Sequence, residues 1–208
     1  MATRVSLVLA SDYRVSNPGH AWSELVKRES DLASIGAHHV VMYESVQTQG
    51  RVFVTIGVRN KVPRAELLRS PVVFEWFDSG GVEDIPAVFV GEIVEKIEIH
   101  APLQGKPAGV VVAVIALVDD VATLLKHIHR TLEQIEAAGV QKLWVYQAFD
   151  DDREVMVLHQ VDDATKAKRL IEQTDPDVAE WMHGAGFGAY PPLFLGTLRG
   201  VMRVRAEA

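Results

Sequence analysis

Apolar runs alternate with helix-type patterns along the whole chain. In each half, the gap between the first two apolar runs carries apolar residues at helical spacing, and a second helical segment begins at Ser70-Pro71 or Asp175-Pro176. Asn17-Pro18-Gly19 and Asp119-Asp120 are typical helix starts. The pattern therefore predicts the order β-α-β-β-α-β twice. The strands are expected at residues 5–10, 40–46, 52–58 and 87–99, and again at 110–118, 143–148, 154–161 and 193–204.

The two halves are copies of one unit. Shifted by 105 positions, residues 71–91 align without a gap over residues 176–196, and a shift of 103 pairs Tyr43 with Tyr146. We predict a first repeat at residues 1–100, a linker at 101–109 and a second repeat at 110–208. Eight positions of the longer alignment are identical: Pro71/Pro176, Val73/Val178, Glu75/Glu180, Trp76/Trp181, Gly81/Gly186, Pro86/Pro191, Phe89/Phe194 and Gly91/Gly196.

Several predicted strands lack the alternation of apolar and polar residues that is typical of a sheet with one face in water. The run at 110–118 is apolar throughout, and only Ser6 interrupts the run at 5–10. Because an open antiparallel sheet with one face in water alternates apolar and polar residues, we expect each sheet to cover the other. The predicted fold class is α+β: two tandem ferredoxin-like β-α-β-β-α-β repeats, packed sheet-to-sheet as a pseudo-dimeric α+β barrel.

This element order and burial resemble the dimeric α+β barrel superfamily in a tandem-duplicated form. The resemblance covers nearly the whole chain and implies that the closing strand of each repeat reaches across to the other repeat. Charges of opposite sign on the two closing strands fit such an exchange, since cross-strand pairs of opposite charge are stabilising. They are Glu92, Glu95 and Glu98 on the first strand and Arg199, Arg203 and Arg205 on the second.

Composition and charge narrow the classes of function. The chain of 208 residues has no cysteine, which excludes disulfides, thiolate metal sites and cysteine nucleophiles. Its formal charge of -7, from 21 basic and 28 acidic residues, argues against a nucleic-acid partner. No apolar run has the ~18 residues of a membrane span, and the N-terminal run is too short for a signal peptide. We expect a cytoplasmic protein with no nucleic-acid or membrane partner, its repeats paired within one chain and homo-oligomerisation left open.

Aromatic residues at matched positions of the two repeats are the candidate ligand-binding residues. Trp76 and Trp181 lie near the end of the second helical segment, and Tyr43 and Tyr146 occupy one strand position. All four also fit ordinary core packing. Their rings would wall a pocket between helices and sheet where an apolar ligand binds, and a tyrosine hydroxyl there would orient a polar ligand atom.

Two histidines are candidate catalytic residues. His159 shares a strand face with apolar residues, and His183 follows Trp181 at a helix C-terminus. His159 also fits a hydrogen-bonded core histidine. The adjacent His38 and His39 are expected to point to opposite faces of their strand, so we predict no metal site.

The resemblance implies a function as well as a fold. The superfamily includes cofactor-independent monooxygenases, haem-degrading enzymes and isomerases that act on apolar or aromatic molecules. It implies that this chain binds such a molecule in a barrel pocket, as a monooxygenase or an isomerase. No catalytic motif of any of these families is found, so we expect no cofactor; haem is an alternative that no residue pattern supports. Two alternatives stay open: a non-catalytic stress or housekeeping protein, and an ACT-like regulatory module suggested by Asn17-Pro18-Gly19.

Overall fold

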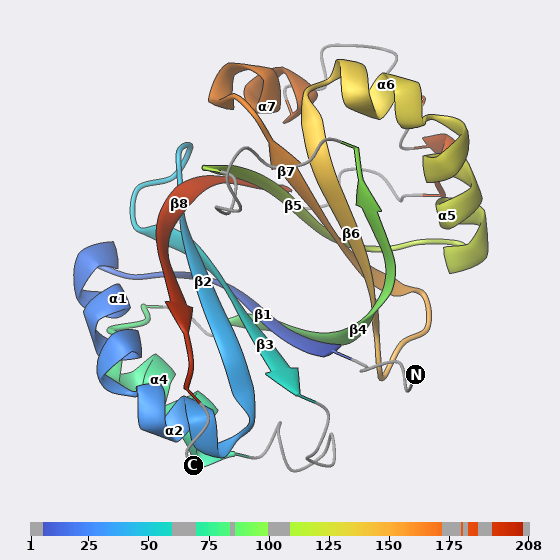
Figure 1. The fold of residues 1–208 in the computed structure, drawn as a ribbon. Helices are drawn as coiled ribbons and strands as arrows, with labels where there is room; N and C mark the ends of the chain where they lie inside the picture. Colours follow the sequence, from blue (N-terminus) through green and yellow to red (C-terminus); the bar gives the residue numbers. More distant parts are fainter. Residues whose placement is uncertain are drawn as a thin grey trace. The chain divides into compact units, whose positions relative to one another are not determined.

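The chain passes twice through β-α-β-β-α-β, as predicted, in a computed structural model that describes residues 6–59, 70–83, 86–99, 109–171, 180, 183–186 and 193–205 (Figure 1). This order confirms the α+β class and the ferredoxin-like repeat. The first repeat comprises β1 (Ser6–Arg14), α1 (Pro18–Lys27), α2 (Glu29–Ser34), β2 (Ala37–Ser45), β3 (Arg51–Arg59), α4 (Pro71–Ser79) and β4 (Ala87–Glu98). The second comprises β5 (Val110–Leu117), α5 (Val121–Arg130), α6 (Leu132–Ala137), β6 (Val140–Ala148), β7 (Glu154–Val161), α7 (Ala164–Ile171) and β8 (Leu193–Arg203).

The first helix of each repeat begins where the sequence predicts. The Asn17 side chain accepts a hydrogen bond from the His20 N–H at 3.1 Å, and Asp120 accepts from the Thr123 N–H at 2.8 Å. Each predicted helix is nevertheless two short helices, because Arg28 separates α1 from α2 and one residue likewise separates α5 from α6. None of the described helices is long and apolar enough to cross a membrane.

The chain divides into two compact units, and each unit combines segments of both repeats. The first unit consists of Met1–Val90 and Leu198–Ala208, and the second of Gly91–Thr197. The division falls inside β4 and β8, so each of these strands contributes to both units. The repeat boundaries stay a prediction from the sequence, and residues 101–108 of the expected linker lie outside the described residues.

Each unit is built on an antiparallel sheet. The strand order is β4-β1-β3-β2-β8 in the first unit and β8-β5-β7-β6-β4 in the second. In the second unit, β4 of the first repeat pairs with β6 of the second, with Gly91 opposite Ala148 and Glu98 opposite Lys142. In the first unit, the Val204 N–H just after β8 donates to the His38 carbonyl at 3.2 Å. The expected exchange of closing strands is therefore confirmed.

Within each unit, the helices lie on one face of the sheet (Figure 1). Successive residues of a strand point to opposite faces, and Val155 and Val157 of β7 belong to the same core as helix residues Leu124 and Ile128. The strand residues of 110–114 are no more than 8% exposed, as their unbroken apolar run predicts. In the first unit, the corresponding core contains Leu25, Leu32, Val40, Met42, Val52, Val54 and Ile56.

The predicted pairing of the charges on the closing strands is wrong. β4 lies between β1 and β6, and β8 lies between β2 and β5, so the two strands are not neighbours. Glu98 instead pairs with Lys142 of β6 at 3.1 Å. Arg199 of β8 lies 4.0 Å from Glu44 of β2. Glu98 and Arg199 thus meet partners on the adjacent strand, whereas Glu95 lies 3.0 Å from His129 of α5.

Candidate functional site

The candidate residues of the first unit lie on two faces of its sheet. Tyr13 of β1 stands opposite Val52, whereas Tyr43 of β2 stands opposite Phe53. Because Val52 and Phe53 are successive residues of β3, Tyr13 and Tyr43 point to opposite faces. Trp76 of α4 lies against Tyr13, on the helix-covered face. The structure therefore does not bring Tyr43 and Trp76 together.

Trp76 belongs to an aromatic cluster that we define as Tyr13, Trp76 and Phe77. The ring of Tyr13 meets those of Trp76 and Phe77 edge to face, at centroid distances of 5.2 and 5.6 Å. All three side chains are at most 9% exposed. The sequence analysis missed Tyr13 because the predicted strand ended at Ala10. The alternation that continues beyond it was the signal that could have found this residue.

Two polar atoms of this cluster are buried without a partner. Among the described residues, neither the Tyr13 hydroxyl nor the Trp76 Nε1 has a hydrogen-bond partner. Burial raises the pKa of Tyr13 well above its ordinary value, so the hydroxyl stays protonated. Leaving such a group unpaired costs about 1–3 kcal/mol. The cluster therefore offers two hydrogen-bond donors next to aromatic faces.

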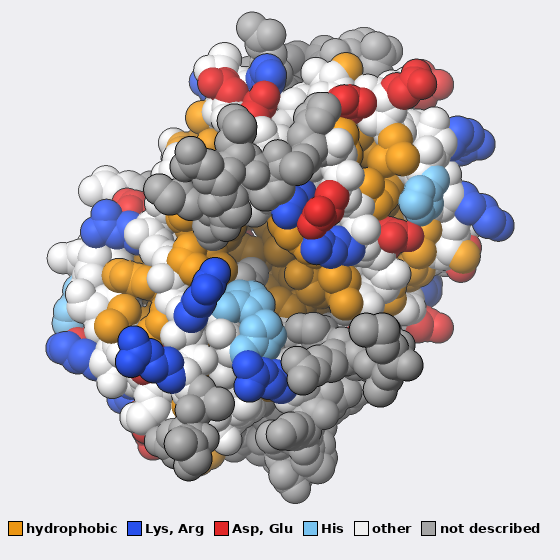
Figure 2. All heavy atoms as spheres, viewed as in Figure 1, with side chains coloured by type: hydrophobic (Ala, Val, Ile, Leu, Met, Phe, Trp, Pro, Cys, Tyr) orange, Lys and Arg blue, Asp and Glu red, His pale blue; other side chains and the backbone are white. Residues whose placement is uncertain are grey.

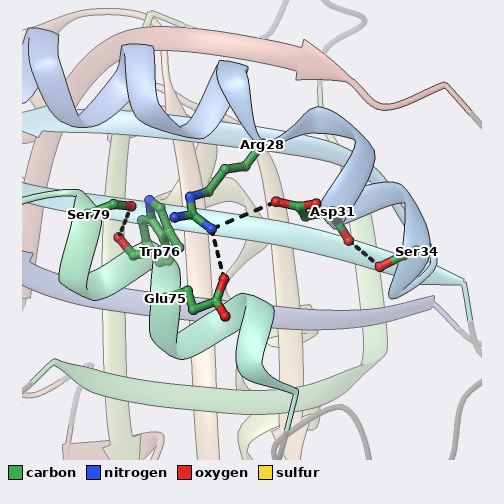
Figure 3. A network of polar contacts seen from close by, with 6 residues as sticks. All are labelled: Arg28, Asp31, Ser34, Glu75, Trp76 and Ser79. Atoms are coloured by element: carbon green, nitrogen blue, oxygen red, sulfur yellow. Dashed lines mark hydrogen bonds and ion pairs between the residues drawn. The ribbon is translucent and has the colours of Figure 1, made fainter.

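Arg28 holds α4 beside the first helices. Its Nη1 lies 3.2 Å from the Glu75 carboxylate, next to Trp76 in the chain, and 3.7 Å from the Asp31 carboxylate (Figure 3). The Ser79 hydroxyl donates to the Trp76 carbonyl at 3.2 Å and closes the last turn of α4. These contacts fix the helix that carries the indole.

His159 is the buried candidate of the second unit. It stands between Val112 of β5 and Leu143 of β6, is 8% exposed, and its Nδ1 has no partner among the described residues. Burial lowers the pKa of His159 from 6.5 to about 4, although a hydrogen bond with the Val112 backbone acts in the opposite direction. The imidazole is neutral at pH 7. It shares its strand face with Val155 and Val157, and this face is the helix-covered one.

Of the remaining candidates of this unit, Tyr146 lies on the other face of the sheet from His159. Tyr146 is half-buried and stands opposite Met156, on the face away from the helices. His183 is exposed, and Trp181 lies outside the described residues. The four candidates therefore do not form one described cluster.

The structure corrects the expectation for His38 and His39. A register shift between Ala37 and His39 interrupts the alternation of β2, and the Nδ1 atoms of the two rings lie 2.7 Å apart. Their ring centroids are 4.3 Å apart. The prediction that they point to opposite faces is wrong because a bulge can place neighbouring residues on one face. Among the described residues, no group of three or more histidine, aspartate or glutamate side chains could hold a metal ion.

The comparisons with known proteins identify a fold. No protein-family model and no curated protein matches the sequence. Among solved structures, an anthrone oxidase-like protein superposes with a TM-score of 0.68 at 11% identity, over 100% of this chain and 97% of that one. A ferredoxin fold protein related to antibiotic biosynthesis monooxygenases, from Listeria monocytogenes, gives 0.53 at 8% identity, over 95% and 96%.

A third neighbour corrects the expectation of no cofactor. A haem-binding protein from Thermus thermophilus superposes with a TM-score of 0.57 at 17% identity, over 93% of this chain and 91% of that one. The expectation is wrong because it rested on a missing motif, whereas haem binding occurs on this fold without one that the sequence analysis recognised. His159 does not fit an axial haem ligand, because its side chain is buried between Val112 and Leu143, whereas an axial ligand must face the porphyrin. The chain thus shares the fold of monooxygenase-related ferredoxin-fold proteins, as its resemblance to the α+β barrels predicted.

Proposed function

We propose that the protein binds a small aromatic molecule with a carbonyl or phenolic oxygen at the aromatic cluster, and that it oxidises this molecule. The observation that carries the proposal is the pair of buried donors, the Tyr13 hydroxyl and the Trp76 indole N–H, in one cluster of rings. Buried donors are normally paired, so two donors of one ring cluster that have no partner among the described residues support a ligand whose atoms accept from them. Tyr43, Tyr146 and Trp181 stay predictions from the sequence and are not part of this proposed site.

An aromatic ketone of the anthrone type fits these donors. Loss of a proton from its CH2 group gives an enolate whose charge is on the oxygen, and hydrogen-bond donors in a dry site stabilise that charge. Reaction with one dioxygen then replaces the two CH2 hydrogens by one oxygen and releases one water. The likeness to the anthrone oxidase-like protein supports this substrate class.

The proposal is tested with anthrone as the probe. We expect anthrone to raise the melting temperature of the protein and to be converted to anthraquinone in air faster than without protein. Tyr13→Phe and Trp76→Phe should each weaken binding about tenfold, the loss of one hydrogen bond. Tyr43→Phe is the matched control, because Tyr43 lies on the opposite face of the same sheet.

Two results would overturn the proposal. One is the absence of any saturable effect of anthrone on the wild-type protein. The other is an equal loss of binding in Tyr43→Phe and Tyr13→Phe. Haem serves as the second probe: if haem stabilises the protein and anthrone does not, the aromatic-ketone assignment fails and haem binding replaces it.

A further inference from the structure

A bulge in β2 places two imidazoles over one glycine. A Cβ added to Gly57 of β3 would lie 2.1 Å from Cε1 of His39 and 2.9 Å from Cε1 of His38. Gly57 stands opposite His39 and follows Ile56, which points to the helices, so both rings lie on the sheet face away from the helices. We call His38 and His39 the histidine pair. Histidine side chains gather on the viewed surface over β2 and β3, with basic side chains around them (Figure 2).

The second unit has the same bulge, but different side chains stand at it. β6 shows a matching register shift, after which Lys142 stands opposite Gln160, as His39 stands opposite Gly57. Gln141 and Lys142 replace the histidine pair, and the Lys142 ammonium bonds to Glu98 at 3.1 Å. The fold therefore requires the bulge, but it requires neither the histidines nor the glycine beneath them.

Both imidazoles are neutral at pH 7. Burial, with the neighbouring His38 as a second cause, lowers the pKa of His39 to about 4. Burial also lowers the pKa of His38, with the charge of Arg59 as a second cause. At 2.7 Å, one Nδ1 donates a hydrogen bond to the other. The neutral imidazole is the form of histidine that binds metal ions.

We propose that the histidine pair is a binding site for a divalent transition-metal ion, Cu²⁺ or Ni²⁺, held by both Nδ1 atoms with water in the other positions. Nitrogens 2.7 Å apart, each about 2 Å from a metal, subtend about 80° at it. This angle is near that of adjacent ligands in a tetragonal Cu²⁺ or Ni²⁺ site, and it is too narrow for tetrahedral Zn²⁺. On binding, the proton between the rings moves to the Nε2 of the ring that carried it, so no proton is released.

The position of the two rings is fixed by the strand beneath them. The absence of a side chain at Gly57 leaves the space that the rings occupy, and half-burial on the sheet limits their motion. Arg59 opposes the metal, because its positive charge acts on His38. Removing that charge should therefore strengthen metal binding.

The test is titration of the full-length, untagged protein with CuCl2, with NiCl2 and with ZnCl2. We expect one tight site per chain and a Cu²⁺ electron paramagnetic resonance spectrum with coupling to two nitrogens. His38→Gln and His39→Gln should each weaken binding at least about tenfold, and Arg59→Gln should tighten it. His20→Gln is the control, since His20 is an exposed histidine of the same unit. Circular dichroism verifies that each variant is folded.

Three outcomes would overturn the proposal. They are the absence of a stoichiometric site, an equal loss of affinity in His20→Gln and His39→Gln, and a site that takes Zn²⁺ more tightly than Ni²⁺. The test is independent of the aromatic cluster, because the histidine pair lies on the other face of the sheet. A negative result with metal therefore leaves the anthrone experiment standing.

Discussion

The two units share a scaffold but differ in the residues that could carry chemistry. Ile56 of the first unit stands opposite Val40, and its counterpart His159 stands opposite Leu143. The cores around both positions are apolar, so the exchange of Ile56 for His159 introduces one polar atom without a described partner. The comparison teaches that duplication preserved the pattern of buried positions, while each copy changed the chemistry at single positions.

The candidate residues of the first unit also differ from their counterparts at single positions. Tyr13, which stands opposite Val52, corresponds to Ala116, which stands opposite Val155. The histidine pair over Gly57 corresponds to a lysine that faces Gln160. The side chains of one unit therefore do not predict those at the corresponding positions of the other unit. A substitution that gives one unit the residue of the other isolates what each difference does.

The largest expected effect concerns the charge of His159. Its pKa is about 4 in the folded protein and near 6.5 when unfolded, so the unfolded chain takes up the proton first as the pH falls. The free energy of unfolding should therefore fall by about 3 kcal/mol between pH 6.5 and 4 through this residue. His159→Ile, which copies Ile56, should remove that part of the acid sensitivity.

Urea unfolding at several pH values measures this effect in the wild type and in His159→Ile. The difference between the two proteins should widen as the pH decreases. The titration of His39 contributes equally to both proteins, so it cancels in the difference between the wild type and His159→Ile. Parallel curves for the two proteins would show that His159 is not a buried neutral histidine.

A smaller effect on the free energy of unfolding is expected from Gly57→Gln, which gives the first unit the residue that the second unit has at Gln160. In Gly57→Gln the new Cβ would lie 2.1 Å from His39 Cε1, so the ring must move. We expect a loss of about 2 kcal/mol in the free energy of unfolding and loss of the metal site. The reverse substitution in the second unit, Gln160→Gly, is the control and should cost about 1 kcal/mol through backbone entropy. Unchanged Cu²⁺ binding in Gly57→Gln would contradict the claim that the histidine pair needs the space over Gly57.

The smallest expected effect is a gain in stability from Tyr13→Phe. Removing a buried hydroxyl without a described partner should raise the free energy of unfolding by about 1 kcal/mol in the absence of ligand, the low end of the cost of an unpaired group. Tyr43→Phe again serves as the control. A clear loss of stability in Tyr13→Phe would show that the hydroxyl has a partner in the folded protein, and the donor argument would fail.

Much of the secondary structure follows from the sequence alone. β7 spans Glu154–Val161, as predicted, because its apolar run is continuous and aspartates bound it on both sides. β1 extends to Arg14 rather than ending at Ala10, and the alternation of Asp12, Tyr13 and Arg14 was the one local sign of this continued pairing with β3. The division between α1 and α2 at Arg28 also lacks a glycine or proline that would mark it.

The candidate site was predictable only in part. Trp76 and His159 were identified from helical spacing and strand alternation, and both are buried. The separation of Trp76 from Tyr43 was not predictable, because the face of each residue depends on the partners of β2 and β1 across β3. The histidine pair was missed for a related reason, since a single bulge overrides the alternation of β2.

The sequence by itself determined the duplicated β-α-β-β-α-β order, the apolar strands and the helix caps. These depend on residues close together in the chain, where hydrophobic period and capping side chains act directly. The tertiary structure decided which polar groups meet: Tyr13 with Trp76, and His38 with His39 over Gly57. Such meetings depend on strand register and bulges, and these are fixed by pairing between strands distant in sequence.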